Sequence, residues 1–157
     1  MKNWLHYTSC GLDNVWLANG YRIKETKYGR AVAITDVDGL HKLLSLNLVE
    51  KKGILTGSEF KFLRVQLGLT QKGLGSLLGG SSENAISLWE RKDTVPAIQD
   101  HWLRMLVIAK LSGDTKVSVA IARLKTVEKL IYQKYVVRGV ENRRIEIVED
   151  SEISLHQ

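Results

Sequence analysis

One stretch of the chain, LTQKGLGSLLGGSSENAISLWERK (Leu69–Lys92), carries two sets of helix start signals separated by a pair of glycines. Thr70 can cap a first short helix, and Ser81 or Ser82 a second, because small hydroxyl side chains accept hydrogen bonds from the free N–H groups of a first turn. Gly79-Gly80 ends the first helix. We therefore expect two short helices joined by a tight turn.

The segments on both sides of this stretch also predict helices. Thr56 and Glu59 have the spacing of a capping box, and Gly68 ends the helix that they begin. Pro96 suits the first position of a further helix, because that position needs no N–H donor. The apolar residues expected on the inner faces of the last two helices are Ile86, Trp89, Ile98, Trp102, Leu103 and Leu106.

The first third of the chain predicts short strands followed by a helix. Asn19-Gly20 lies between two apolar-rich runs and is a strong hairpin signal, which predicts a hairpin near residues 14–26. A second turn at residues 27–30 leads into a third short strand. Asp36 or Asp38 can then cap a helix with leucines at helical spacing.

Residues 114–138 predict one long amphipathic helix, because apolar residues recur there at spacings of three and four. The sequence RRIEIVED (143–150) predicts a strand. The expected fold class is therefore α+β and mainly α, in three parts. These are a small N-terminal hairpin and helix unit (1–54), a central domain of four to five helices (55–111), and a C-terminal helix and strand extension (112–157).

Composition narrows the classes of function. The hydrophobic content of 44% is that of a globular protein rather than a disordered chain. No apolar run approaches the roughly 18 residues that a membrane span needs, and no signal peptide is apparent. We therefore expect a cytoplasmic protein with no membrane partner. The single cysteine, Cys10, excludes an intramolecular disulfide and zinc sites built on two or more thiolates. The net charge of +6 favours a polyanionic partner, although a solvated basic surface also explains it.

Two helices joined by a turn of three or four residues, the second starting with small polar residues, are the arrangement of a helix-turn-helix. Its second helix enters the major groove of DNA. Glycine inside a helix costs about 1 kcal/mol relative to alanine. We therefore expect close approach of the next helix at Gly73 or Gly75.

The residues around this turn resemble the Cro/C1-type (Xre) helix-turn-helix, a lambda-repressor-like domain. The matching positions, within residues 56–110, are Leu69-Thr70-Gln71, Ile86-Ser87-Leu88-Trp89-Glu90-Arg91 and Pro96. The resemblance implies a DNA-binding transcriptional regulator that binds a palindromic operator as a homodimer. The turn at residues 79–82 is one residue longer than in that family, which leaves open whether Glu83 or Asn84 leads the base contacts.

An N-terminal α+β unit ahead of this domain is similar to the MqsA-type antitoxin and autorepressor family. This second resemblance implies an antitoxin that binds a toxin through its N-terminal module and represses its own operon. That family's N-terminal module holds zinc through paired Cys-x-x-Cys motifs. Because this chain has only Cys10, the metal site is not carried over.

Five residues of the second helix are candidates for contacts with DNA bases. Asn84 is the first choice, because an asparagine amide can bond an adenine edge through two hydrogen bonds, although it also suits a helix cap. Glu83 can accept from cytosine N4, or it can interact with the helix dipole. Leu88 either contacts a thymine methyl group or packs against a neighbour. The full set is Ser82, Glu83, Asn84, Ser87 and Leu88.

A second set is expected to contact phosphates, which fixes position without specifying sequence. Gln71, beside the backbone N–H groups after Thr70, can hold a phosphate at a helix N-terminus. Arg91 and Lys92 end the second helix. The full set is Thr70, Gln71, Lys72, Arg91 and Lys92. The two tryptophans, Trp89 and Trp102, are expected in the core.

Other chemistry has less support. His6, Cys10 and His41 could form a metal site or a cysteine–histidine nucleophile pair, but no spacing fixes their geometry. The glycines lack the Lys-Ser or Lys-Thr ending of a phosphate-binding loop. We therefore expect no enzyme activity, no catalytic residue, no metal and no cofactor.

The sequence thus predicts a dimeric DNA-binding repressor that reads an inverted repeat with the helix at 82–91 and self-associates through the helix at 114–138. One alternative is an antitoxin that binds a toxin through its N-terminal module. The other is a protein-interaction adaptor that does not bind DNA.

Overall fold

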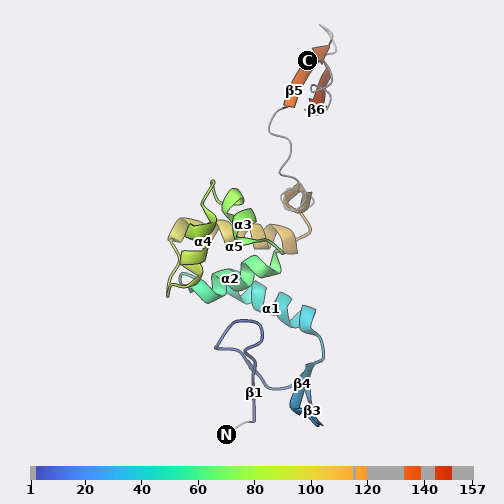
Figure 1. The fold of residues 1–157 in the computed structure, drawn as a ribbon, viewed down its shortest axis with the longest axis vertical. Coiled ribbons are helices and arrows are strands. Elements are labelled where there is room, and N and C mark those ends of the chain that lie inside the picture. The colour runs from blue at the N-terminus through green and yellow to red at the C-terminus, as the bar shows by residue number, and fades with distance from the viewer. Residues whose placement is uncertain (1–2, 115, 120–132, 139–143, 150–157) are drawn as a thin grey trace. The chain divides into compact units, whose positions relative to one another are not determined.

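The computed structural model describes residues 3–114, 116–119, 133–138 and 144–149 (Figure 1). The chain forms two compact units, Met1–Ile121 and Ala122–Gln157. The described strands are β1 (Leu5–His6), β2 (Trp16–Leu17), β3 (Tyr21–Thr26), β4 (Gly29–Ile34), β5 (Gln133–Arg138) and β6 (Arg144–Glu149). The helices are α1 (Val37–Val49), α2 (Gly57–Gln66), α3 (Gln71–Leu77), α4 (Glu83–Glu90) and α5 (Ala97–Leu111). The fold is mixed α+β and mainly helical, as predicted.

The helix starts follow the cap signals of the sequence. Asp36 caps α1 by accepting the Gly39 N–H at 3.0 Å. Thr56 and Glu59 form both hydrogen bonds of a capping box at the start of α2. Thr70 and Ser82 cap α3 and α4. These caps are local interactions between residues three apart, which is why the sequence alone predicts them.

The strand pairing differs from the prediction for residues 14–26. β2 pairs with β1, and β3 pairs with β4, so no hairpin forms across Asn19-Gly20. The tightest hairpin turns need positive φ at both central residues, whereas Gly20 has φ 79° and Asn19 does not have positive φ. The hairpin turn lies at Lys27-Tyr28, within the second turn predicted at residues 27–30, and the third predicted strand is β4. The Thr26 hydroxyl donates there to the Gly29 carbonyl oxygen at 2.7 Å.

The hydrophobic core joins the N-terminal segment to the central helices. Tyr7, Leu12 and Val15 belong to the same buried cluster as Phe60 and Leu103. Helix α2 contacts α1, α4 and α5, and α3 packs on α4 (Figure 1). The expected boundaries at residues 54 and 111 stay predictions.

Two apolar residues expected on the inner face of α5 lie outside it. Ile98 is 68% exposed and Trp102 is 51% exposed, whereas Leu103 is fully buried. Helix α5 has apolar residues around most of its circumference, so periodicity alone does not identify the buried side. The prediction of a core role for Trp102 is therefore wrong, while Trp89 is half-buried against the core, as expected.

The last residues of the helix predicted at 114–138 form a strand instead. Residues Gln133–Arg138 form β5, which pairs antiparallel with β6. β-branched and aromatic residues such as Tyr135, Val136 and Val137 favour a strand when a partner strand is present. The predicted strand in RRIEIVED is confirmed by β6. Residues 116–119 are helical, and the rest of the predicted helix, 120–132, lies outside the described residues.

The connection between α1 and α2 is held by Arg104 of α5. Its guanidinium donates to the carbonyl oxygens of Lys51, at 2.5 Å, and of Gly53. Asp100, one turn earlier and fully buried, accepts the Leu55 N–H at 2.7 Å and pairs with Arg104. We call Asp100 and Arg104 the linker clamp.

Candidate nucleic-acid interface

The N-cap of α4 defines the register of this helix. The Ser82 hydroxyl accepts the Ala85 N–H at 3.1 Å, so Glu83 is the first helical residue and Asn84 the second. The longer turn at residues 79–82 is taken up before the helix, where Gly79 and Gly80 have φ values of 74° and 77°. Asn84 is therefore not the cap residue.

One side of α4 is polar and open to solvent. At about 100° per residue, the side chains of Glu83, Asn84, Ser87 and Leu88 spread over an arc of roughly 140°. Glu83, Asn84 and Leu88 are exposed and Ser87 is half-buried. In the described part of the chain, the side chains of Glu83 and Asn84 make no hydrogen bond and no ion pair. We call Ser82 and these four residues the outer face of α4.

The opposite side of α4 is anchored in the core. Ile86 is fully buried, and Trp89 packs edge-to-face on Phe60 with 6.4 Å between ring centroids. Helix α3 approaches α4 closely because Gly75 has no side chain. A Cβ at Gly75 would collide with the Ser81 carbonyl oxygen and would lie 3.6 Å from Ile86. This contact explains one of the two glycines in α3.

A buried polar network connects three helices at the end of α4. The Arg64 Nε of α2 lies 2.5 Å from the Glu90 Oε1, and the Gln71 amide nitrogen of α3 donates to the Glu90 Oε2 at 2.8 Å. The Arg64 guanidinium also donates to the Leu69 carbonyl oxygen at 2.8 Å. Glu90 therefore fixes α4 relative to the start of α3. We call Arg64, Gln71 and Glu90 the α4 anchor.

The sequence reasoning missed Glu90 and Arg64 as positioning residues. The available signal was the place of Glu90 four residues after Ile86, on the inner side of the helix. A carboxylate at such a position needs a buried partner. Gln71 was predicted to hold a phosphate, but its side-chain amide donates instead to the Glu90 carboxylate within the α4 anchor.

The other residues predicted to contact phosphates lie near α4. Thr70 is an exposed N-cap whose hydroxyl accepts the Gly73 N–H at 3.0 Å. The Arg91 Nε donates to the Ser87 carbonyl oxygen at 3.2 Å, at the exposed end of α4. Lys72 and Lys92 are exposed. The Lys92 carbonyl oxygen accepts the Gly57 N–H at 3.0 Å, which attaches this end of α4 to the start of α2.

Of the histidines and the cysteine considered for other chemistry, His6 bonds to Asp13, whereas His41 and Cys10 both bond to Tyr7. The His6 Nε2 lies 2.6 Å from the Asp13 carbonyl oxygen, and the His41 ring contacts the Tyr7 hydroxyl at 3.0 Å. Burial, and secondarily Cys10, raises the pKa of the Tyr7 hydroxyl. Among the described residues, no group of three or more histidine, cysteine or acidic side chains could hold a metal ion. Nor is any helix there long and apolar enough to cross a membrane.

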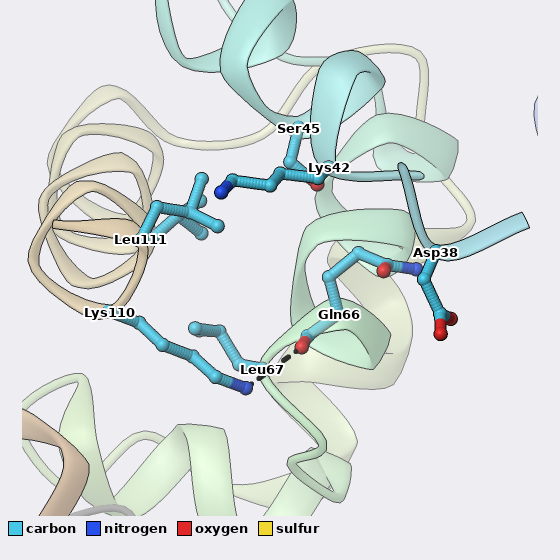
Figure 2. A pocket seen from close by; sticks show the side chains of 8 residues that line it. Asp38, Lys42, Ser45, Gln66, Leu67, Lys110 and Leu111 are labelled. Atoms are coloured by element: carbon cyan, nitrogen blue, oxygen red, sulfur yellow. Dashed lines mark hydrogen bonds between the residues drawn. The ribbon is translucent and has the colours of Figure 1, made fainter. Parts of the chain in front are cut away.

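A small pocket lies between α1 and the ends of α2 and α5 (Figure 2). Its volume is about 200 Å³, below the roughly 300 Å³ at which ligand pockets usually begin. The Lys110 ammonium donates to the Gln66 carbonyl oxygen at 3.1 Å across one side of it. The buried Ser45 hydroxyl donates to the His41 carbonyl oxygen at 2.7 Å. The pocket thus has the size of a packing gap.

No protein-family model, curated protein or solved structure matched this chain in the three comparisons.

Proposed function

We propose that this chain is a sequence-specific DNA-binding transcriptional regulator that reads the major groove with α4. The observation that carries the proposal is the outer face of α4. It presents Asn84, Glu83 and Leu88 to solvent on a helix whose other side is anchored by Ile86 and the α4 anchor. A groove-reading helix needs this combination of free polar side chains and a fixed backbone.

Each position on the outer face has a contact that suits it. Asn84 bonds an adenine edge through its amide, and Glu83 accepts from a cytosine amine. Leu88, which is 45% exposed, meets a thymine methyl group. Ser82 and Ser87 bond bases or phosphates.

Residues around the helix would hold the DNA backbone. Arg91 and Lys92 lie at the C-terminal end of α4, and Thr70 and Lys72 lie at the start of α3. The Gln71 side chain bonds to Glu90, so its part in these contacts is to fix the start of α3. Phosphate contacts of this kind supply affinity that falls with salt and set the register of the base contacts.

A two-fold dimer is part of the proposal. We place its surface on α5 instead of on the helix expected at 114–138, because residues 120–132 lie outside the described residues and Gln133–Arg138 form β5. Four large apolar side chains, spaced by four, three and three residues, are at least half exposed: Ile98, Trp102, Met105 and Ile108. We call them the α5 stripe. Of the other exposed residues of this helix, only His101 and Lys110 are polar. Antiparallel pairing of two stripes would bring Ile98 to Ile108 of a second copy and Trp102 to Met105, so the surface complements itself.

The proposal is tested by substitutions at two positions of α4. DNA fragments bound by the full-length chain are first selected from a random pool. Asn84→Ala is expected to weaken binding to the selected sequence by about 1 to 3 kcal/mol and to change binding to a scrambled duplex little. Arg91→Ala is expected to weaken both and to reduce the salt slope by about one.

Asn47→Ala, at an exposed asparagine of α1, is the matched control and should leave affinity unchanged. If neither α4 substitution changes binding to any duplex, the proposal is wrong and the adaptor alternative gains. Repression is tested by a reporter under the selected sequence. The antitoxin alternative predicts a small protein that co-purifies from the native operon.

A further inference from the structure

The β3–β4 hairpin has two chemically different faces. Residues directly opposite one another in an antiparallel pair point to the same face. One face carries Tyr21, Ile23, Glu25, Arg30, Val32 and Ile34. The other carries Arg22, Lys24, Thr26, Gly29, Ala31 and Ala33. We call the second one the basic face, because Arg22 and Lys24 are its charged residues.

Positive charge is concentrated in this hairpin. Residues 21–34 contain four cations, Arg22, Lys24, Lys27 and Arg30, and one acid, Glu25. Their net charge of +3 is half of the +6 of the whole chain, carried by 14 of its 157 residues. Glu25 lies opposite Arg30 on the other face. The basic face therefore has no acid.

The basic face is open and shallow. The residues opposite Arg22 and Lys24 are Ala33 and Ala31, whose small side chains leave the two cations unobstructed. Every residue of the basic face is exposed. The ion pairs in the described part of the chain do not involve Arg22 or Lys24.

The tip of the hairpin combines a cation with an aromatic ring. Tyr28 is 90% exposed, and the Lys27 ammonium lies 5.4 Å from the centre of its ring. A two-stranded ribbon with so little burial is marginally stable in water by itself. A polyanion against the basic face would neutralise its charge and add contacts to the ribbon.

We propose that the β3–β4 hairpin is a second contact with duplex DNA, in which Arg22, Lys24 and Lys27 meet backbone phosphates. This inference rests on the proposed DNA-binding function but uses residues distant in sequence from α4. The contacts add affinity and salt dependence without reading sequence. Tyr28 adds a phenol to the sugar-phosphate surface at the tip.

The test compares the salt dependence of DNA affinity for full-length variants. Arg22→Gln with Lys24→Gln removes two charges and leaves Glu25 and Arg30, on the other face, unchanged. Because each phosphate contact contributes about 0.9 to the slope of log affinity against log salt, the double variant should lower that slope by about 2. Lys42→Gln with Lys52→Gln removes two exposed charges elsewhere and should leave the slope unchanged.

A charge swap checks the role of the face itself. Lys24→Ala with Ala31→Lys moves the cation to the opposite strand on the same face, so wild-type affinity and slope should return. This variant also keeps the overall charge and composition.

The outcomes separate the two proposals. If the hairpin variants bind as the wild type does while Asn84→Ala loses selectivity, the hairpin inference alone is wrong. If the hairpin substitutions lower the salt slope of DNA affinity while Asn84→Ala and Arg91→Ala leave DNA binding unchanged, the groove-reading role of α4 is wrong. The hairpin contact then stands. The hairpin inference is overturned if the Lys42→Gln, Lys52→Gln control lowers the salt slope as much as the hairpin substitutions do. It is also overturned if the hairpin substitutions weaken binding to phosphatidylglycerol vesicles but not to DNA.

Discussion

Glu59 shows how a buried carboxylate can favour its charged form. Burial by itself would raise its pKa, but the hydrogen bond and charge of Lys51 and the hydrogen bond from the Thr56 N–H outweigh burial. Together they hold the pKa of Glu59 below its ordinary value of 4.5. A carboxylate with a lowered pKa in the folded state stabilises the fold fully above its unfolded pKa. That contribution is lost as the pH falls below about 4.5 and through the lowered pKa.

Glu59→Gln tests this effect. The variant keeps an oxygen acceptor for the capping box but loses the ion pair with Lys51, whose ammonium lies 2.6 Å from the Glu59 Oε1. We expect lower stability than the wild type at pH 7 and a smaller loss of stability below about pH 4.5. Urea midpoints measured across this range provide the check, and parallel curves for the two proteins would contradict it.

The linker clamp makes a stronger prediction at residue scale. Asp100 is fully buried and is paired with Arg104. Asp100→Ala leaves the Arg104 charge without its partner and the Leu55 N–H without its acceptor, so the free energy of unfolding should fall by about 3 to 5 kcal/mol. Asp93→Ala, at an exposed acid, should change it by less than about 0.5 kcal/mol. Chemical denaturation measures both, and similar values would refute the role of the clamp.

The contact between α3 and the turn before α4 belongs to the scale of elements. Gly75→Ala puts a methyl group against the Ser81 carbonyl oxygen, so α3 and α4 must separate. We expect the free energy of unfolding to fall by about 1 to 3 kcal/mol and DNA binding to weaken.

Gly73→Ala, two residues earlier in the same helix, is the control. Its new methyl group would lie 3.2 Å from the Thr70 Oγ1, a tight but adjustable contact, and alanine gains up to about 1 kcal/mol in helix propensity. A near-neutral effect is expected in thermal unfolding. Equal losses at both glycines would show that close packing at Gly75 is not the reason.

The elements that the sequence predicts well are those defined by local contacts. The caps at Asp36, Thr56 and Ser82 join residues three apart, and all three are as expected. The pairing of β2 with β1 was not predictable in this way, because it joins residues ten and twelve positions apart. The inward position of Glu90 could be inferred from its spacing to Ile86, whereas its partner Arg64 lies on another helix and could not be inferred.

At the scale of the whole molecule, the α5 stripe predicts the self-association surface. Trp102→Ser with Met105→Ser removes the centre of the stripe, and we expect a shift from dimer to monomer and a loss of cooperative binding to a palindromic site. Leu43→Ser, at an α1 leucine that is 58% exposed, is the matched control. Sedimentation of the full-length proteins measures the change. A dimer that survives the double substitution places the interface outside α5.

The linker clamp also determines where the chain tolerates alteration. Arg104 and Asp100 hold the backbone of residues 51–55 by several hydrogen bonds, so a protease site or an inserted peptide in this short connection would break them. Within the described residues, the hydrogen bonds of the Lys27-Tyr28 turn stay inside the hairpin. Labels, affinity tags and cleavage sites should therefore leave the fold intact at the two-residue hairpin tip and disrupt it between α1 and α2, where Leu55 is fully buried.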